Sequence, residues 1–124
     1  LTNILRDMDE DMELGRLYMP KECLDKAGIV VTDDTHLSEI LNHPNLGVAR
    51  AALAEQALLR YAEADAALAK LNAKQMKPAV IMQAAYRKIF DAMQKRGWEV
   101  VRPRIKTPKS TLLLTALRIW LTGR

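Results

Sequence analysis

Three oxygen-bearing side chains follow one another at intervals of four in the opening stretch LTNILRDMDEDMELGRLYMP, namely Asn3, Asp7 and Asp11. Residues four apart in a helix lie one turn from each other, so these side chains should share a face. Two carboxylates and an amide are hard oxygen ligands of the kind that Mg²⁺ prefers, and Mg²⁺ often completes its shell with phosphate oxygens of a substrate. The spacing predicts a magnesium-binding face, with a solvated acidic surface as the alternative.

A candidate anion-binding pair follows directly in the sequence GRLYMP. Pro20 disfavours a helical conformation at the preceding residue, so residues 16–19 should be extended. Arg16 and Tyr18 then point to the same side, where a guanidinium and a phenol could bind a diphosphate. The acidic helix itself places Arg6 on the solvent side, where we expect it to pair with Asp9 or Glu10.

The elements that must position these residues are predicted to be helices. They cover residues 1–13, 20–26, 36–41, 46–71, 78–96 and 110–122, with Gly15, Gly28 and Gly97 as stops and Asp34 or Thr35 as a cap. The buried stripes are expected to be Leu53, Ala57, Leu58, Tyr61, Ala64, Leu68 and Leu71, and then Ile81, Met82, Ala85, Ile89 and Met93. Only residues 29–32 and 100–101 suggest strands. The predicted fold class is all-α.

Charge divides the 124-residue chain into two unlike parts. Residues 1–49 carry ten acids and four bases, whereas residues 50–124 carry five acids and fifteen bases. Solvated faces of opposite sign are the default interpretation, and no nucleic-acid-binding pattern accompanies the basic part, so we expect no nucleic-acid partner. No signal peptide or membrane-spanning run is visible, and Cys23 is the only cysteine, which favours the cytoplasm.

The string Asn-x-x-x-Asp-x-x-x-Asp followed by Gly-Arg-x-Tyr-x-Pro resembles the second aspartate-rich motif of the squalene and phytoene synthase family. The segment AAYRKIFDAMQKRGWEVVRPRIKTPKSTLLLTALR resembles the family's carboxy-terminal region. Within the family, RGWEVVRPR and the closing helix around residues 115–118 are most similar to bacterial presqualene diphosphate synthases, with phytoene synthases as near neighbours.

The resemblance implies an isoprenoid-synthase-type helical domain that uses Mg²⁺ to join two farnesyl diphosphates, or two geranylgeranyl diphosphates in the phytoene branch. It implies that Asn3, Asp7 and Asp11 bind metal, and that Arg16 and Tyr18 meet diphosphate. Tyr86 would line the prenyl pocket. Arg104 would bind diphosphate, with Arg102 as the rival position. No nicotinamide cofactor is expected, since a glycine-rich dinucleotide motif is missing from the sequence.

The family's first aspartate-rich cluster has no counterpart in these residues, so residues 1–124 are expected to be the carboxy-terminal portion of one synthase domain, inactive alone. A non-enzymatic helical interaction module is the alternative of another class. For the apolar closing helix, packing against the domain is expected, and peripheral membrane contact is the alternative. Nothing in the sequence specifies an oligomeric state.

Overall fold

The computed structural model describes residues 1–122, and every regular element in this range is a helix. The helices are α1 (Thr2–Arg6), α2 (Met8–Glu13), α3 (Lys21–Lys26), α4 (Leu37–Leu41), α5 (Leu46–Ala69), α6 (Lys77–Arg96) and α7 (Lys109–Thr122). The all-α prediction is confirmed. Residues 29–32 and 100–101, which suggested strands, belong to irregular segments instead.

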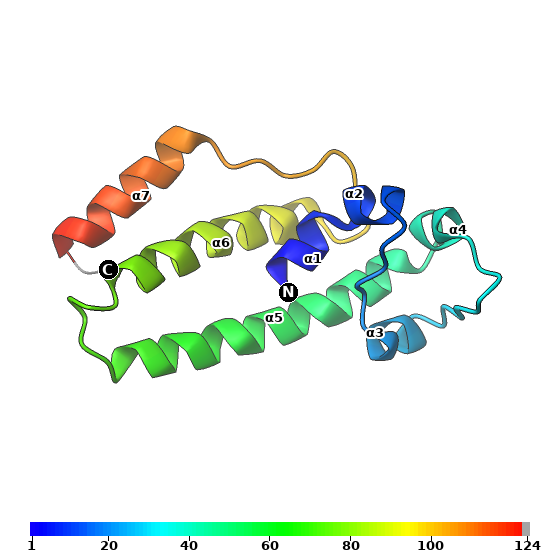
Figure 1. The fold of residues 1–124 in the computed structure, drawn as a ribbon, viewed down its shortest axis with the longest axis horizontal. Coiled ribbons are helices and arrows are strands. Elements are labelled where there is room, and N and C mark those ends of the chain that lie inside the picture. The colour runs from blue at the N-terminus through cyan, green and yellow to red at the C-terminus, as the bar shows by residue number, and fades with distance from the viewer. Residues whose placement is uncertain (123–124) are drawn as a thin grey trace.

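The long helices α5 and α6 run side by side in opposite directions and form the frame of the molecule (Figure 1). Helix α1 packs against both of them, and α7 returns along α6. Helices α2, α3 and α4 gather at the end of the frame where α5 begins (Figure 1). Residues 97–108 form a connector that leaves α6 near α2 before it reaches α7.

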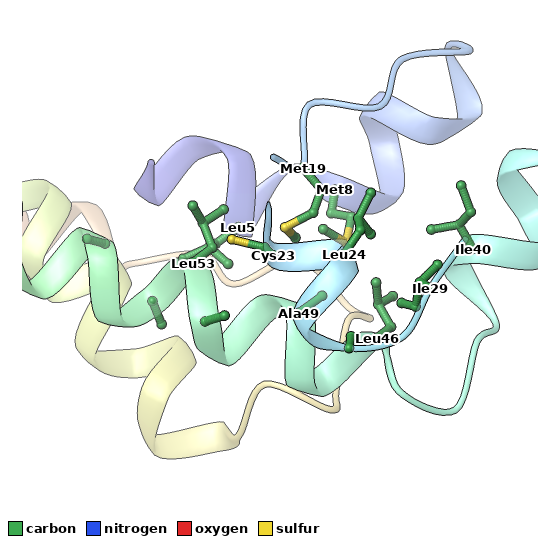
Figure 2. Packing of buried hydrophobic residues seen from close by; sticks show 14 of the residues in the cluster. Leu5, Met8, Met19, Cys23, Leu24, Ile29, Ile40, Leu46, Ala49 and Leu53 are labelled. Carbon is green, nitrogen blue, oxygen red and sulfur yellow. The ribbon is translucent and has the colours of Figure 1, made fainter. Parts of the chain in front are cut away.

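The hydrophobic core lies beneath α1, α2 and α3, against the first half of α5. Its buried side chains include Leu5, Met8, Met19, Cys23, Leu24, Ile29, Ile40, Leu46, Ala49 and Leu53, which face one another in Figure 2. Phe90 and Met93 close the same core from α6. The small side chains of α5 allow α3 to pack closely against it. This packing fixes α1 and α2, which carry the acidic motif.

Two predictions about the first half of the chain were wrong in detail. The opening helix is interrupted at Asp7, whose φ of −99° and ψ of 11° separate α1 from α2. Helix α4 begins after His36 and not after Asp34 or Thr35. The Thr35 hydroxyl instead accepts a hydrogen bond from the Thr32 amide at 2.9 Å, which makes a local turn before the helix.

The predicted buried stripes hold where α5 and α6 meet the core and fail beyond it. Leu71 lies past the end of α5 and is exposed, and Met82 is also exposed. Phe90 and Arg50, which were not assigned to the core, are almost completely buried. Periodicity marks the apolar face of a helix but not the length over which that face is covered.

Candidate active site

The three residues of the acidic motif remain one turn apart although the helix is interrupted between them. The Asp7 amide donates to the Asn3 carbonyl and the Asp11 amide donates to the Asp7 carbonyl, each at 2.8 Å. These are helical contacts between residues four apart, so the register continues through the break. The predicted spacing is therefore present, and metal binding by these side chains remains a prediction.

Asp7 lies between two arginines. Arg6 binds the carboxylate through two hydrogen bonds, Nε to Oδ1 at 2.7 Å and Nη2 to Oδ2 at 2.9 Å. Arg104 reaches the same Oδ1 from the connector at 3.1 Å. The hydrogen bonds from Arg6 lower the pKa of Asp7, although burial opposes them, and Arg104 adds a smaller effect. The expected pairing of Arg6 with Asp9 or Glu10 was wrong, because the guanidinium folds onto its sequence neighbour.

The connector brings the basic part of the chain onto the acidic part. Arg102 lies 2.7 Å from an Asp9 carboxylate oxygen, and Arg104 also approaches Glu10 at 3.3 Å. Both arginines thus reach the acidic helices, and the assignment of diphosphate binding to Arg104, with Arg102 as the rival, stays a prediction. Some basic residues of the second part of the chain therefore pair with acidic residues of the first part. The default interpretation, in which the two parts form separate solvated faces, does not hold for these residues.

Arg16 and Tyr18 leave the acidic helices on one side of an extended segment. Both are exposed, while Leu17 is half-buried and Met19 is buried, which is the alternation expected of extended backbone. The Arg16 amide donates to the Asp11 carbonyl at 2.8 Å and ties the segment to the end of α2. Arg16, Tyr18 and Asp11 line the same small cavity of about 10 Å³.

A larger cavity of about 460 Å³ lies beside α1, between α5 and α6. Its lining is largely apolar and includes Leu1, Thr2, Ala57, Tyr61, Ala64, Ala79, Met82 and Tyr86, with Asn3, Arg60 and Gln83 as polar members. Asn3 and Tyr86 thus line the same cavity, while their roles in metal binding and in the prenyl pocket stay predictions. The Thr2 hydroxyl and the Tyr61 phenol form a hydrogen bond of 2.6 Å in its wall.

The donor set of the acidic motif fits a magnesium ion in type. The motif offers one amide and two carboxylates on successive helical turns, from Asn3, Asp7 and Asp11. Within residues 1–122, however, His, Cys, Asp and Glu nowhere form a group of three arranged to hold a metal alone. A magnesium ion here would therefore take its other ligands from substrate, water or further protein groups.

Comparison of the sequence with known proteins identifies a family. A model of squalene/phytoene synthase matches residues 1–111. The chain belongs to the squalene/phytoene synthase family. No solved structure gives a significant match.

Presqualene diphosphate synthases are among the relatives. The one from Zymomonas mobilis is 38% identical over 99% of this chain and 41% of its own length. The one from Sinorhizobium fredii is 39% identical over 90% of this chain and 39% of its own length. A 15-cis-phytoene synthase from a Paracoccus species is 34% identical over 89% of this chain and 34% of its own length. The chain thus spans about two fifths of the length of the first curated relatives.

Two residues near the acidic motif were missed as contributors by sequence reasoning. Arg6 binds Asp7, and a direct neighbour is poorly judged by helical periodicity. Arg50 lies in the core beneath the motif. The sequence does indicate that Arg50 is buried, since it stands four residues after Leu46 and three before Leu53, inside the apolar stripe of the helix.

Proposed function

We propose that these residues form part of a magnesium-dependent prenyltransferase that condenses two farnesyl diphosphates head to head to presqualene diphosphate. The observation that carries the proposal is the junction of a charged cluster and an apolar cavity along the successive helices α1 and α2. Asn3 faces the cavity, and Asp7 and Asp11 continue from it along the same register. Such a junction suits a substrate with a diphosphate head and a prenyl chain. Relatives that carry the name presqualene diphosphate synthase support the choice of substrate.

In this proposal, Asn3, Asp7 and Asp11 hold Mg²⁺, together with a second acidic cluster from elsewhere in the native enzyme. When bound, Mg²⁺ supplies positive charge that stabilises the departing diphosphate. Asp7 is already ionised in its arginine contacts, because those contacts lower its pKa. The carboxylate therefore needs no deprotonation before it binds a cation.

The basic side chains have a complementary role. Arg104 reaches Asp7 and Glu10 from the connector, at the edge of the acidic helices. A diphosphate bound at this edge would offer the guanidinium a more highly charged partner than a carboxylate. Arg16 and Tyr18 would bind diphosphate from the opposite end, since both are exposed and lie beside Asp11 near the end of α2. The two groups would then hold the leaving group between them.

The apolar cavity would form one wall of the site that shields a prenyl chain from water. Loss of one diphosphate leaves an allylic cation, which the double bond of the second substrate attacks, and a proton is lost as the cyclopropane ring closes. Water would quench this cation, so a wall of alanine, methionine and tyrosine side chains is chemically suitable. We assign Tyr86 to this wall, close to the reacting end.

The proposal includes three further assignments. Residues 1–124 form the carboxy-terminal part of one synthase domain. The enzyme works in the cytoplasm, with peripheral membrane contact as an open alternative, and no helix described within residues 1–122 is both long and apolar enough to cross a bilayer. Condensation of two geranylgeranyl diphosphates to phytoene is the alternative activity. The similarity to a 15-cis-phytoene synthase supports this alternative.

Product analysis of the native enzyme tests the function. The purified protein is incubated with Mg²⁺ and farnesyl diphosphate, or with Mg²⁺ and geranylgeranyl diphosphate, and products are identified by mass spectrometry. We expect presqualene diphosphate from farnesyl diphosphate and little phytoene. Phytoene as the main product would select the alternative activity, and failure to join either substrate would overturn the proposal.

A further inference from the structure

Arg50 is a buried cation that the proposed chemistry does not use. Its side chain is only 1% exposed, in the face of α5 that packs against the core. Within residues 1–122, no acidic side chain pairs with it. Its partners are backbone carbonyls: Nη1 donates to Trp98 at 2.6 Å and to Val100 at 3.0 Å, and Nη2 donates to Leu5 at 3.0 Å.

These three carbonyls belong to two segments that are far apart in the sequence. Leu5 lies in the last turn of α1, two residues before Asp7. Trp98 and Val100 open the connector that carries Arg102 and Arg104. One guanidinium therefore joins the acidic helix to the basic connector through backbone atoms. It also lies 5.5 Å from the centre of the Trp98 ring, which adds a cation–π contact.

Gly47, one turn before Arg50, provides a second and independent sign of this docking. A Cβ atom added at Gly47 would lie 2.8 Å from Glu99 Cγ and 3.2 Å from Glu99 Cα. Glu99 stands between the two connector residues that Arg50 binds. The connector backbone thus packs directly on the first turn of α5, where a side chain larger than that of glycine would push Glu99 away.

The rest of the connector is held from α6. Arg96 donates to the Val100 carbonyl at 3.1 Å and also to the Pro103 carbonyl. Residues 98–103 are therefore bound by two arginines through their carbonyl groups. Arg102 and Arg104 extend from this held segment to Asp9 and Asp7. Their placement depends on backbone that Arg50 and Arg96 fix.

Stability alone does not explain why a cation is buried at position 50, because removing a charge from water costs free energy. Burial lowers its pKa to about 10, helped by the charge of Arg96, so the side chain remains a cation at neutral pH. Its Nε has no hydrogen-bond partner within the described residues. An apolar side chain commonly serves a core at least as well as a buried ion. The arginine provides what an apolar side chain cannot, a fixed fork between three carbonyls.

We propose that Arg50 is a positioning residue, which holds the connector on α5 so that Arg104 meets Asp7 in the geometry that binds diphosphate. The inference rests on the proposed function for its ligand and on the contacts of Arg50 and Gly47 for its mechanism. Arg50 touches no substrate in this proposal. It acts through the connector, and its loss should displace Arg104 from its contact with Asp7.

Kinetics of the native enzyme test the coupling, with Arg50→Gln, Gly47→Ala and Arg104→Gln measured separately and combined. We expect kcat/KM for farnesyl diphosphate to fall by about 10- to 100-fold in Arg50→Gln, mainly through KM, as for other residues that orient a binding group. Gly47→Ala removes no charge and should lower kcat/KM in the same direction. In the Arg104→Gln background, Arg50→Gln should change kcat/KM by less than about 2-fold. Arg118→Gln removes an exposed cation from α7 and serves as the control.

Hydrogen exchange supplies a readout that does not depend on activity. In Arg50→Gln and in Gly47→Ala, amides of residues 98–105 should exchange faster, while those around Phe90 and Met93 keep their native rates. Should Arg50→Gln fail to fold, Gly47→Ala still decides the question. Multiplicative losses in the Arg50 and Arg104 double variant, or unchanged exchange in the connector of Gly47→Ala, would overturn the inference. An enzyme without prenyl diphosphate activity would instead overturn the proposed function, and the exchange data would still stand.

Discussion

The two ends of the α1 helix lie in opposite physical environments. Beyond its carboxyl end, Asp7 is bound by Arg6 and Arg104, and ionisation is favoured because these contacts lower its pKa. Beside its amino end, Thr2 and Tyr61 line the apolar cavity, and burial raises the pKa of Tyr61 although its hydrogen bond to Thr2 opposes this. One region favours charge and the other favours the neutral form.

This difference indicates how a small helical chain can offer two kinds of binding surface side by side. The charged region is braced from within, by Arg50 and by the arginines of the connector. The apolar region is open, and Met82 and Leu1, which line its cavity, remain exposed. A ligand with a charged head and an apolar tail would engage both regions at once. The following experiments test the two regions separately.

The largest effect is expected at Asp7. In the native enzyme, Asp7→Asn removes the charge that Mg²⁺ would require and leaves the side-chain shape unchanged. Turnover should fall by at least about 100-fold, because a charged group at the reacting centre is lost. Steady-state assays at limiting and saturating Mg²⁺ measure this. Asp25→Asn, which alters an exposed pair with Lys21, serves as the control. Near-normal turnover of Asp7→Asn at limiting Mg²⁺ would refute the assignment.

A smaller effect is expected when the cavity is filled. Ala64→Leu adds three carbon atoms to a half-buried position in the cavity lining. We expect kcat/KM for farnesyl diphosphate to fall by about 10-fold, since overpacking of a pocket typically costs 1–3 kcal/mol. Ala66→Leu makes the same change two residues away, at an exposed position of α5. Equal activity of the two variants would show that the cavity does not receive the prenyl chain.

The pH dependence of stability should differ in sign between the two regions. Asp7 has its pKa lowered from 3.8 in the fold, so its contribution is present above that value and is lost as the pH falls through the lower folded pKa. Tyr61 has its pKa raised from 10.0, so its contribution is present below that value and is lost as the pH rises through the higher folded pKa. Each contribution should be about 1 kcal/mol.

Urea unfolding of wild type, Asp7→Asn and Tyr61→Phe over a range of pH measures both contributions. The stability difference between wild type and Asp7→Asn should shrink in acid only. The difference between wild type and Tyr61→Phe should shrink in alkali only. If both differences respond in the same pH range, the contrast between a charged region and an apolar region is wrong.

The sequence predicts the local parts of this site better than the long-range ones. The register of Asn3, Asp7 and Asp11 follows from helical spacing, and the alternation at Arg16 and Tyr18 follows from Pro20. The glycines at positions 15, 28 and 97 predict helix ends, and their positive φ angles of 76°, 70° and 101° agree with that role. Such features depend on a few neighbouring residues only.

The long-range contacts depend on how the connector folds back. The pairing of Arg104 with Asp7 spans most of the chain, and no local pattern specifies it. Arg50 interrupts an apolar stripe, which marks it as unusual but does not name its three carbonyl partners. The exposure of Met82 likewise depends on what covers α6, and not on the helix itself.

The smallest effect is expected at α7. Its Thr115 and Ile119 are buried, and Lys77 of α6 donates to the Trp120 carbonyl at 2.6 Å while lying 5.2 Å from the centre of the Trp120 ring. These contacts hold α7 on α6, so we expect packing to be its main role. A double variant of the exposed residues, Leu114→Ser with Leu117→Ser, should therefore bind vesicles containing anionic lipid as the native enzyme does.

Co-sedimentation with these vesicles measures the binding, and thermal unfolding confirms that the α7 variant is folded. The basic residues of the connector provide the comparison, because a cationic surface binds anionic lipid without apolar insertion. If the leucine variant loses vesicle binding while it remains folded, then α7 inserts into membrane. The apolar region would in that case continue beyond the cavity onto a lipid-facing surface. The apolar region would then contact membrane, whereas the charged region would contact the diphosphate.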